Sequence, residues 1–325
     1  VWCGANRFEH TEITRQDEVI RSFMGFDRMA GHKSFQRYFQ KFNQATNQKV
    51  FTQWYQWFFS QLSFDNFTLD VDSSVHTKYG EQQGAKRGYN THKPGRVSHH
   101  PLMAFIPECR MVANFWLRSG DAYTSNNIES FLDDTFEKLQ GKKVGLFRAD
   151  SGFYDKKVFN YLERKDIKYI IAVRLHRPLQ QKIAAQRTWL KVDNGIEIAQ
   201  STYQSPSWDK ERKIVMVRQY IPSRPKATGK TLRLFSDDEV LNKYRYSCFM
   251  TDLDLPAEIV WSIYRKRADA ENRIKELKYD FGFDSFNLKD FYATEAALTF
   301  AMIAYNLMAL FRTFVLQEKT QKTKK

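Results

Sequence analysis

The spacing of apolar residues changes along the chain from a helical period to a strand period. Up to about residue 64, apolar and aromatic residues recur at helical spacing, which predicts helices over residues 18–24, 34–42 and 49–62. From Phe67 to Asp72 the period becomes two, which is typical of a strand. Its apolar residues share one face, and Asp70 and Asp72 share the other. We therefore expect a helical N-terminal subdomain followed by a sheet.

Strand and helix patterns continue through the middle of the chain. Strands are predicted at residues 101–106, 110–117, 144–147 and 168–173, and helices at 126–139 and 155–164. Three strands in succession, then alternating helix and strand, predict a mixed α/β fold with helices flanking the sheet. From residue 176 to 245 helical periodicity is weak, and runs at 196–203, 213–220 and 231–234 predict a β-rich insertion.

The stretch from Pro256 to Gly282 has the pattern of one long amphipathic helix. An apolar stripe runs along it, formed by Ile259, Ile263, Ala270, Ile274, Leu277 and Phe281. A polar group falls within a sector of roughly 60° beside that stripe, formed by Tyr264, Arg267, Glu271 and Lys278. Asp269 and Glu276 point to another side. A carboxylate fixed on a helix beside cations is well placed for chemistry on a phosphate.

These patterns divide the chain into five expected segments. The first is a helical N-terminal subdomain (1–64), interpreted as the end of a longer product because no Met precedes Val1. The others are a first core part (65–175), the β-rich insertion (176–245), a second core part (246–316) and a basic, disordered tail (317–325). The run from residue 296 to 315 approaches membrane-spanning length. Asn306 and Arg312 interrupt it, so we expect a buried helix instead.

Charge and cysteine usage narrow the class of protein. The net charge of +14, from 51 Lys and Arg against 37 Asp and Glu, favours a polyanionic partner, most simply nucleic acid. A glycine-rich loop from residue 79 to 96 concentrates this charge in Lys86, Arg87, Lys93 and Arg96. Three widely spaced cysteines argue for a reducing cytosol, without a disulfide framework. No residue spacing suggests zinc, and adjacent His99 and His100 would face opposite sides of a strand.

Three acidic residues stand where elements end or turn toward solvent: Asp72 and Asp150 after strands and Glu271 on the late helix. Converging carboxylates repel one another unless a divalent cation holds them, and their oxygens suit Mg²⁺ or Mn²⁺. Two such ions can clamp the attacking and leaving oxygens of a phosphodiester. Other interpretations remain open. Asp70 could replace Asp72, Asp150 could cap a helix, and Glu271 could join an ion-pair ladder with Arg267 and Lys275.

Several motifs resemble one enzyme family. The spacing Tyr264-x2-Arg267-x3-Glu271-x6-Lys278 resembles the Tyr-Arg-Glu-Lys signature of bacterial insertion-sequence transposases of the DDE type. Asp72-Ser73-Ser74 resembles their first catalytic motif and favours Asp72 over Asp70. Asp150-Ser151-Gly152-Phe153 resembles the second, Asp-x-Gly-Phe/Tyr. The resemblance covers residues 65–316, and it extends to the insertion before Glu271 and to the loop that ends at His99-His100-Pro101.

The resemblance implies an RNase H-like catalytic core with a defined chemistry. Asp72, Asp150 and Glu271 would be catalytic and would bind two Mg²⁺ (or Mn²⁺) ions. The enzyme would nick DNA at the transposon end and then use the freed 3′-hydroxyl to attack a second strand, in cut-and-paste movement. The resemblance also implies that the DNA is contacted by Tyr264, Arg267 and Lys278.

The resemblance also implies the setting in which the protein acts. Its partners would be the double-stranded DNA of transposon ends and target, and a second copy of the chain in a synaptic homodimer. The protein would act in the bacterial cytoplasm. Relatives stack a flipped base on a Trp of the insertion, but we expect Trp189 and Trp208 to be packing residues. The alternatives are an RNase H-like nuclease and a catalytically silent DNA-binding derivative.

Overall fold

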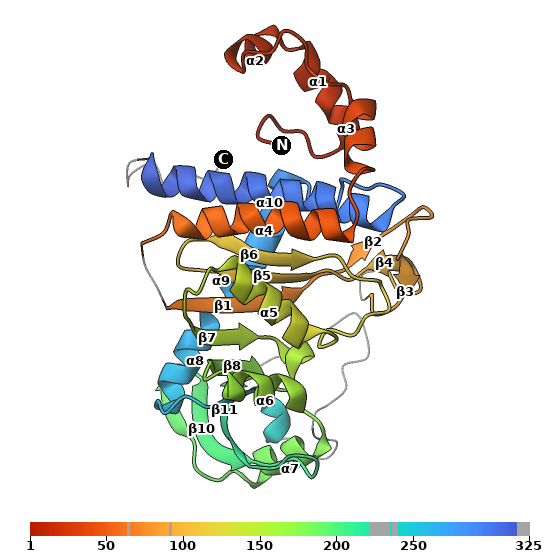
Figure 1. The fold of residues 1–325 in the computed structure, drawn as a ribbon. Coiled ribbons are helices and arrows are strands. Elements are labelled where there is room, and N and C mark those ends of the chain that lie inside the picture. The colour runs from red at the N-terminus through yellow and green to blue at the C-terminus, as the bar shows by residue number, and fades with distance from the viewer. Residues whose placement is uncertain (64–65, 91–92, 222–234, 236–239, 317–325) are drawn as a thin grey trace. The chain divides into compact units, whose positions relative to one another are not determined.

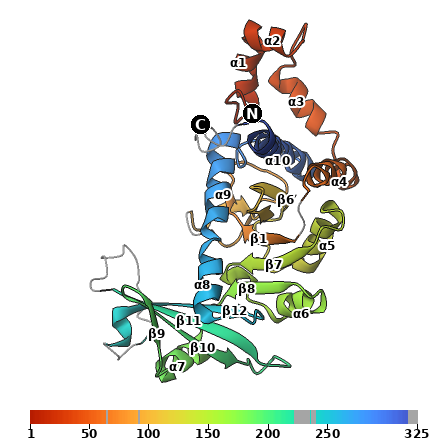
Figure 2. The same ribbon diagram turned by 90° about the vertical axis from the view of Figure 1, so that its left-hand side faces the viewer.

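The computed structural model describes residues 1–63, 66–90, 93–221, 235 and 240–316, and it divides the chain into two compact units. The first unit comprises Val1–Val144 and Ala268–Lys325, and the second comprises Gly145–Arg267. Figures 1 and 2 show the elements of both units along the chain. The predicted tail (317–325) and the predicted strand at 231–234 lie outside the described residues.

Helices dominate the first unit. They are α1 (Thr11–Gln16), α2 (Glu18–Phe23), α3 (His32–Phe39), α4 (Gln44–Ser60), α5 (Ile128–Lys138), α9 (Ala268–Phe281) and α10 (Phe291–Phe314). The helices predicted near the N-terminus are confirmed as α2, α3 and α4. The sequence pattern missed α1, because Ile13 is the single apolar residue of this short helix and one residue makes no apolar stripe. Asn43 begins α4, accepting a hydrogen bond from the Thr46 backbone N–H at 3.0 Å.

The sheet strands of the first unit are β1 (Phe67–Ser73), β5 (Leu102–Ile106) and β6 (Met111–Trp116), which lie antiparallel in the order β6-β5-β1. All three were predicted, with ends that differ by one or two residues. A smaller sheet joins β2 (His76–Thr77), β3 (Lys86–Arg87) and β4 (Val97–His99) in the order β2-β4-β3. This small sheet ties the loop after β1 to the basic stretch, an arrangement that the pattern of apolar residues could not indicate.

Helix α10 is the apolar run that approached membrane-spanning length. It is long and apolar enough to cross a bilayer, but 67% of its most apolar window is buried inside the protein. It packs beside α4 and against β6 (Figure 1). Inside this interface, the buried Asn306 donates to the Val112 carbonyl at 2.9 Å and accepts from the Val112 N–H at 2.8 Å. Helix α10 is therefore a core helix in this structure, as expected.

The second unit is built on a mixed sheet. Its strands follow the order β7-β8-β12-β11-β10-β9, where β7 and β8 are parallel and the other neighbours are antiparallel. Their bounds are β7 (Val144–Ala149), β8 (Lys168–Ala172), β9 (Leu190–Asp193), β10 (Ile196–Tyr203), β11 (Arg212–Tyr220) and β12 (Tyr244–Thr251). The helices are α6 (Lys156–Arg164), α7 (Arg177–Ala185) and α8 (Ala257–Arg265). The predicted mixed α/β fold is confirmed.

Alternation along β8 places helices on both faces of this sheet. Tyr169 stacks near Phe159 of α6, with ring centroids 5.3 Å apart. Its neighbour Ile170 belongs instead to a core cluster with Val260 of α8. Because consecutive strand residues point to opposite faces, α6 and α8 cover opposite sides. Helix α7 was not predicted, since only Leu179 and Ile183 of its residues are buried and the apolar signal is too short.

Candidate active site

Asp72 lies at the end of β1, where the chain leaves the sheet. Its Cα is paired with that of Met103 on β5, and Asp70 is paired with Phe105. Asp70 is 0% exposed, whereas Asp72 is partly exposed. The Ser73 backbone N–H donates a hydrogen bond to Asp72 Oδ1 at 2.8 Å, which orients the carboxylate. These exposures agree with the preference for Asp72 over Asp70, and the assignment stays a prediction.

The turn after Asp72 is held by a histidine from a later segment. His100 Nδ1 lies 2.9 Å from the Ala122 carbonyl oxygen, and because a carbonyl only accepts, this nitrogen carries the proton. In the neutral ring, Nε2 then accepts from the Ser73 hydroxyl at 3.2 Å. Arg118 Nε donates to the His100 carbonyl at 3.0 Å. The backbone beside Asp72 is thus fixed by side chains that sequence reasoning did not assign to the site.

Lys278 lies close enough to Asp72 for their charges to interact. Burial lowers the pKa of the Lys278 ammonium, while the negative charges of Asp284 and Asp72 oppose that shift. The side chain of Lys278 is itself partly buried on α9. Within the first unit, the structure therefore brings together one predicted catalytic carboxylate and one predicted DNA contact.

Glu271 lies in the first turn of α9, in the same unit as Asp72, and it is exposed. The buried side of α9 carries Ala270, Ile274, Leu277 and Phe281, which is the second half of the predicted apolar stripe. Asp269 and Glu276 lie on another side, as predicted. Both pair with Arg273, at 3.0 Å each. Asp269 and Glu276 are therefore tied to Arg273, whereas Glu271 lies at an exposed position of the same helix.

The single helix predicted over residues 256–282 is wrong. The structure has α8, which ends at Arg265, and α9, which begins at Ala268. The Arg267 N–H donates to the Tyr264 carbonyl at 2.9 Å and closes the turn between them. The apolar stripe has no member between Ile263 and Ala270, and the buried residue of this turn is Arg267, so no apolar side chain holds the turn against the core. Tyr264 and Arg267 belong to the second unit, whereas Glu271 and Lys278 belong to the first.

Asp150 directly follows β7 and begins a 3₁₀ helix over Ser151–Phe153. Its Oδ1 accepts a hydrogen bond from the Gly152 N–H at 2.9 Å. The alternative interpretation of Asp150 as a helix cap is therefore confirmed. A cap of this kind also fixes the direction of the carboxylate, which a metal ligand requires, so the two roles are compatible.

The end of β7 is fastened to the end of α8 within the second unit. Arg148 Nη1 donates to the Ile263 carbonyl at 2.6 Å, and the Tyr264 hydroxyl lies 3.4 Å from the carbonyl of Ala149. The Tyr264 ring packs against Phe249 in a tilted arrangement, with centroids 4.3 Å apart. In this structure Tyr264 supports the residue before Asp150, a role that sequence reasoning missed.

Arg267, the third predicted DNA contact, is 4% exposed. Its guanidinium is therefore covered in this structure, whereas a phosphate contact requires an accessible cation. The assignments of Arg267 and Tyr264 as DNA contacts stay predictions. Lys278 is the more accessible cation of the signature.

The candidate carboxylates fit a divalent metal by their chemistry, since aspartate and glutamate oxygens are preferred by Mg²⁺ and Mn²⁺. Backbone N–H groups orient two of them, Asp72 and Asp150, as they orient the carboxylates of metal sites. Among the described residues, no group of three or more His, Cys, Asp or Glu side chains lies close enough together to hold a metal ion. Asp72 and Glu271 lie in the first unit and Asp150 in the second, so the metal site stays a prediction.

The two tryptophans of the predicted insertion are packing residues in the structure. Trp208 is 8% exposed, and Arg212 covers its ring with the guanidinium carbon 5.0 Å from the centroid. Trp189 is partly buried, and Arg218 covers its ring at 4.4 Å. The expectation of packing is thus met for both.

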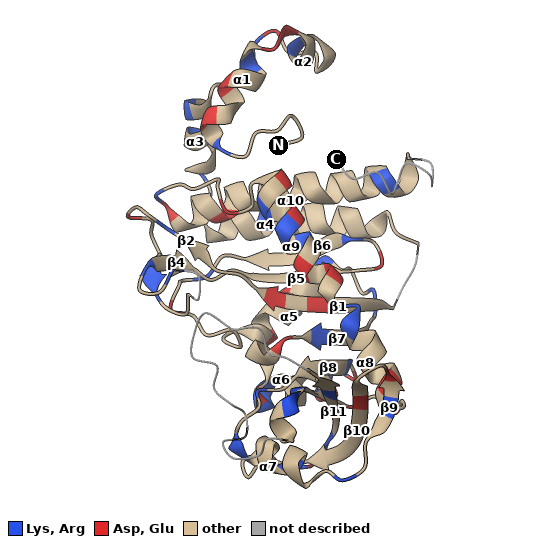
Figure 3. Cartoon of the chain, turned by 180° about the vertical axis from the view of Figure 1, so that it is seen from behind, with Lys and Arg blue, Asp and Glu red and all other residues tan. Residues whose placement is uncertain are grey.

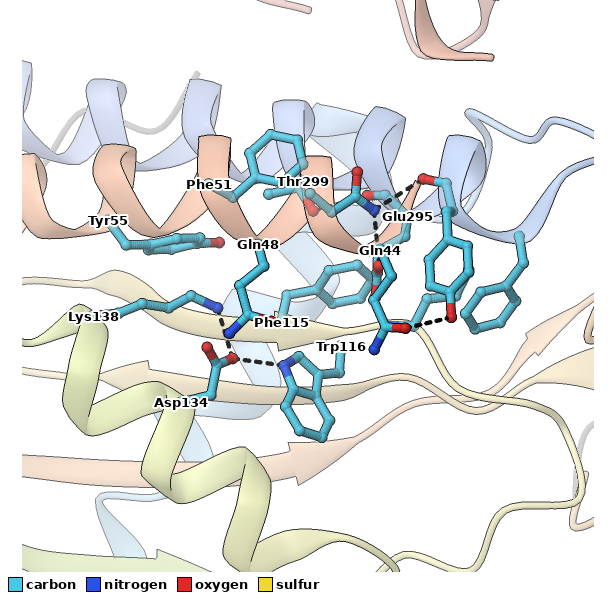
Figure 4. Close-up of a pocket in the computed structure, with 14 residues that line it drawn as sticks. Gln44, Gln48, Phe51, Tyr55, Phe115, Trp116, Asp134, Lys138, Glu295 and Thr299 are labelled. Atoms are coloured by element: carbon cyan, nitrogen blue, oxygen red, sulfur yellow. Dashed lines mark hydrogen bonds and ion pairs between the residues drawn. The ribbon is translucent and has the colours of Figure 1, made fainter. Parts of the chain in front are cut away.

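A cavity of about 190 Å³ in the first unit is lined by α4, α5, β6 and α10 (Figure 4). Its charged groups are bonded to nearby polar groups. Lys138 Nζ and Trp116 Nε1 both donate to Asp134 Oδ2, at 2.8 and 2.6 Å. Glu295 accepts from Asn47 at 2.9 Å, and burial raises the pKa of its carboxyl. Each charged side chain of the lining thus has a polar partner within the first unit, as buried charged groups require.

Acid sensitivity is expected from the small sheet near Asp72. Burial lowers the pKa of His99 to about 4, while a hydrogen bond to the Gln83 carbonyl opposes the shift and the charge of Lys78 adds to it. Below the ordinary pKa of 6.5, the unfolded chain binds a proton that the folded chain refuses until about pH 4. The free energy of unfolding should therefore fall by up to about 3 kcal/mol as the pH drops through this window.

Denaturation in urea at both ends of the window would measure this loss. The variant His99→Gln keeps an N–H donor for the Gln83 carbonyl but does not titrate. It should lose about 3 kcal/mol less than the unchanged protein between the two pH values. Burial also lowers the pKa of His76, so part of the loss should persist in the variant. Equal acid sensitivity of the two proteins would contradict the assignment to His99.

Comparison with known proteins defines the class. The family model described as the transposase DDE domain, group 1, matches residues 1–325, and the chain belongs to this family. No curated protein matches the sequence. Among solved structures, piggyBac transposase in a synaptic complex with hairpin DNA is similar, at 11% sequence identity and a TM-score of 0.45. The match covers 76% of this chain and 49% of that one, so the chain spans about half the length of this structural relative.

Proposed function

We propose that the protein is a transposase that cleaves DNA strands at the ends of a bacterial insertion sequence and joins them to a target by a cut-and-paste route. The observation that carries the proposal is the match of a DDE transposase family model to the whole chain. The Tyr-Arg-Glu-Lys spacing supports the finer assignment to insertion-sequence enzymes. The net charge of +14 supports double-stranded DNA as the partner.

Each candidate residue has a defined task in the proposed reaction. Asp72, Asp150 and Glu271 would hold two Mg²⁺ or Mn²⁺ ions, which when bound lower the barrier by stabilising charge on the attacking and leaving oxygens. Asp72 and Asp150 are already oriented by backbone N–H groups, which reduces the reorganisation needed. Lys278, whose charge interacts with that of Asp72, would hold the phosphate beside it.

In the first step water loses a proton and attacks the phosphorus, the bond from phosphorus to the 3′-oxygen breaks, and the leaving oxygen takes up a proton, which gives a 5′-phosphate and a 3′-hydroxyl. In the second step that 3′-hydroxyl attacks a phosphorus of the target strand, with loss of its proton, and the target 3′-oxygen leaves. Tyr264 and Arg267 would contact DNA near the cut. The proposed assembly is a homodimer on paired ends, in the cytoplasm of a bacterium.

Metal removal tests the proposal directly. The full chain is incubated with DNA taken from either side of its own gene, and strand breaks are mapped on a sequencing gel. We expect breaks at one position of each end in Mg²⁺ or Mn²⁺, none in EDTA, and recovery when Mg²⁺ is restored. Cleavage that proceeds unchanged in EDTA, or no cleavage under any metal by a folded chain that binds DNA, would refute the catalytic proposal.

A further inference from the structure

The described parts of the loop that follows Asp72 form a basic surface. We name this surface the basic patch and define it by Tyr79, Lys86, Arg87, Tyr89, Lys93 and Arg96. All six residues are exposed, and the rings of Tyr79 and Tyr89 are 68% and 72% exposed. The charge of Lys86 is balanced by that of Asp121, since Lys86 Nζ lies 3.1 Å from Asp121 Oδ2. Figure 3 shows Lys and Arg beside β4, as well as on other elements of the chain.

Three cations of the basic patch have no carboxylate opposite them. Among the ion pairs of the described residues, none includes Arg87, Lys93 or Arg96. Lys93 Nζ lies 4.8 Å and the Arg96 guanidinium 5.9 Å from the centre of the Tyr79 ring. Lys93 Nζ also donates to the Tyr79 hydroxyl. One exposed ring thus gathers two like charges, an arrangement that an anion would stabilise.

The backbone beneath the basic patch is held tightly. A Cβ on Gly88 would come within 1.8 Å of the Gly120 carbonyl oxygen, and a Cβ on Gly120 would come within 2.0 Å of the Ser98 carbonyl oxygen. Only glycine fits at these two close approaches. The buried Asn90 donates to Thr77 Oγ1 at 3.0 Å and accepts from the Lys93 N–H at 2.9 Å. The backbone that carries Arg87 and Lys93 is therefore held at these points before any partner binds, which lowers the entropic cost of binding.

The basic patch is also connected to the candidate active site by a few residues. Strand β2 begins four positions after Asp72 and pairs with β4, with His76 opposite His99. Strand β4 in turn pairs with β3, which carries Lys86 and Arg87. The Ser74 N–H donates to the Pro101 carbonyl at 3.1 Å and closes the path back to the end of β1. An anionic chain that lies on the basic patch would therefore run alongside the segment that leaves Asp72.

We infer that the basic patch binds the phosphate backbone of the DNA substrate, with Arg87, Lys93 and Arg96 as the phosphate contacts and Tyr79 as the ring that holds two of them in place. The inference rests on the proposed function for the choice of DNA as the polyanion. It adds a binding surface outside the Tyr-Arg-Glu-Lys signature. Phosphate contacts position a nucleic acid without reading its sequence, so the surface should bind duplexes of any sequence.

Salt-dependent binding tests this inference without relying on cleavage. The full chain is titrated into a fluorescein-labelled duplex in EDTA, and anisotropy gives the dissociation constant at a series of KCl concentrations. The patch variant Arg87→Ala/Lys93→Ala/Arg96→Ala should lower the slope of log K against log salt by about 2.7, since each lost phosphate contact removes about 0.9. The control variant Lys33→Ala/Lys41→Ala/Lys49→Ala removes the same charge from exposed positions on and between α3 and α4. Its slope should stay near that of the unchanged protein.

A second pair of variants tests the role of the ring. Tyr79→Phe keeps the face on which Lys93 and Arg96 lie, whereas Tyr79→Leu removes it, so only the second should weaken binding clearly. Thermal melting of every variant checks the fold. A patch variant whose slope equals that of the control variant would overturn the inference. Loss of binding in the patch variant together with metal-independent cleavage would refute the proposed catalysis and leave the basic patch standing. A folded wild-type chain that binds no duplex would overturn both.

Discussion

Replacing Glu271 with glutamine is expected to reduce strand cleavage by at least about a thousandfold, which corresponds to roughly 4 kcal/mol of transition-state stabilisation. The substitution keeps the size of the side chain and removes the charge that a divalent cation requires. Glu271 is exposed in the first turn of α9, so the fold should tolerate the change. Binding to end DNA in EDTA should survive, because no cation of the protein is altered. The measurements are single-turnover cleavage in Mg²⁺ and anisotropy in EDTA.

The matched control lies on the same helix. Glu276 pairs with Arg273 at 3.0 Å and with Arg312 at 3.1 Å. Glu276→Gln should therefore lower the melting temperature while cleavage per folded molecule is kept. Glu271→Gln should thus reduce cleavage, whereas Glu276→Gln should reduce thermal stability. Near wild-type cleavage by Glu271→Gln in Mg²⁺ would remove Glu271 from the catalytic set.

The second large effect is expected at Asp72. Asp72→Asn should lose about as much cleavage as Glu271→Gln, since each removes one charged metal ligand. Asp70→Asn should behave differently, because Asp70 is 0% exposed. A change at such a site disturbs buried polar bonding and should cost about 1–3 kcal/mol of folding stability. Cleavage per folded molecule should remain within a few-fold of wild type.

Cleavage and urea denaturation measured on the same two preparations separate these outcomes. The expected pattern is a folded but inactive Asp72→Asn and a less stable but active Asp70→Asn. If both variants lose cleavage equally while both remain folded, the choice between the two aspartates has no support. If only Asp70→Asn is inactive, the first catalytic residue is Asp70.

Local patterns were sufficient to predict most strands and helices. The period of two from Phe67 to Asp72 predicted β1, and the apolar stripe over Ala270 to Phe281 predicted the buried side of α9. Helix ends were predicted less well. The helix predicted from residue 126 begins at Ile128, and Asn127 before it lies in the left-handed region, at φ 59°. A residue in that conformation cannot be recognised from the period of apolar residues.

The features that could not be predicted depend on contacts distant in sequence. Four fixed residues at helical spacing suggested one helix, and only the three-dimensional structure shows that the chain turns between Arg265 and Ala268. The Tyr264 hydroxyl bonds to the carbonyl of Ala149, the residue before Asp150, so this contact joins residues more than a hundred positions apart. So does the hydrogen bond of Asn306 to Val112. The candidate carboxylates were found from the sequence because their motifs are local, whereas the side chains that hold them in place were not.

The contact between Asn306 and Val112 occupies one position on a sheet edge. Among the described residues, strand β6 is the outermost strand of the order β6-β5-β1, so no further strand bonds to its outward backbone groups. The Asn306 amide satisfies both the N–H and the carbonyl of Val112, in place of a neighbouring chain. Backbone groups that are already bonded are not available to an extended segment from another molecule. The polar residue that interrupts the most apolar helix thus blocks edge-to-edge pairing at this position of the sheet.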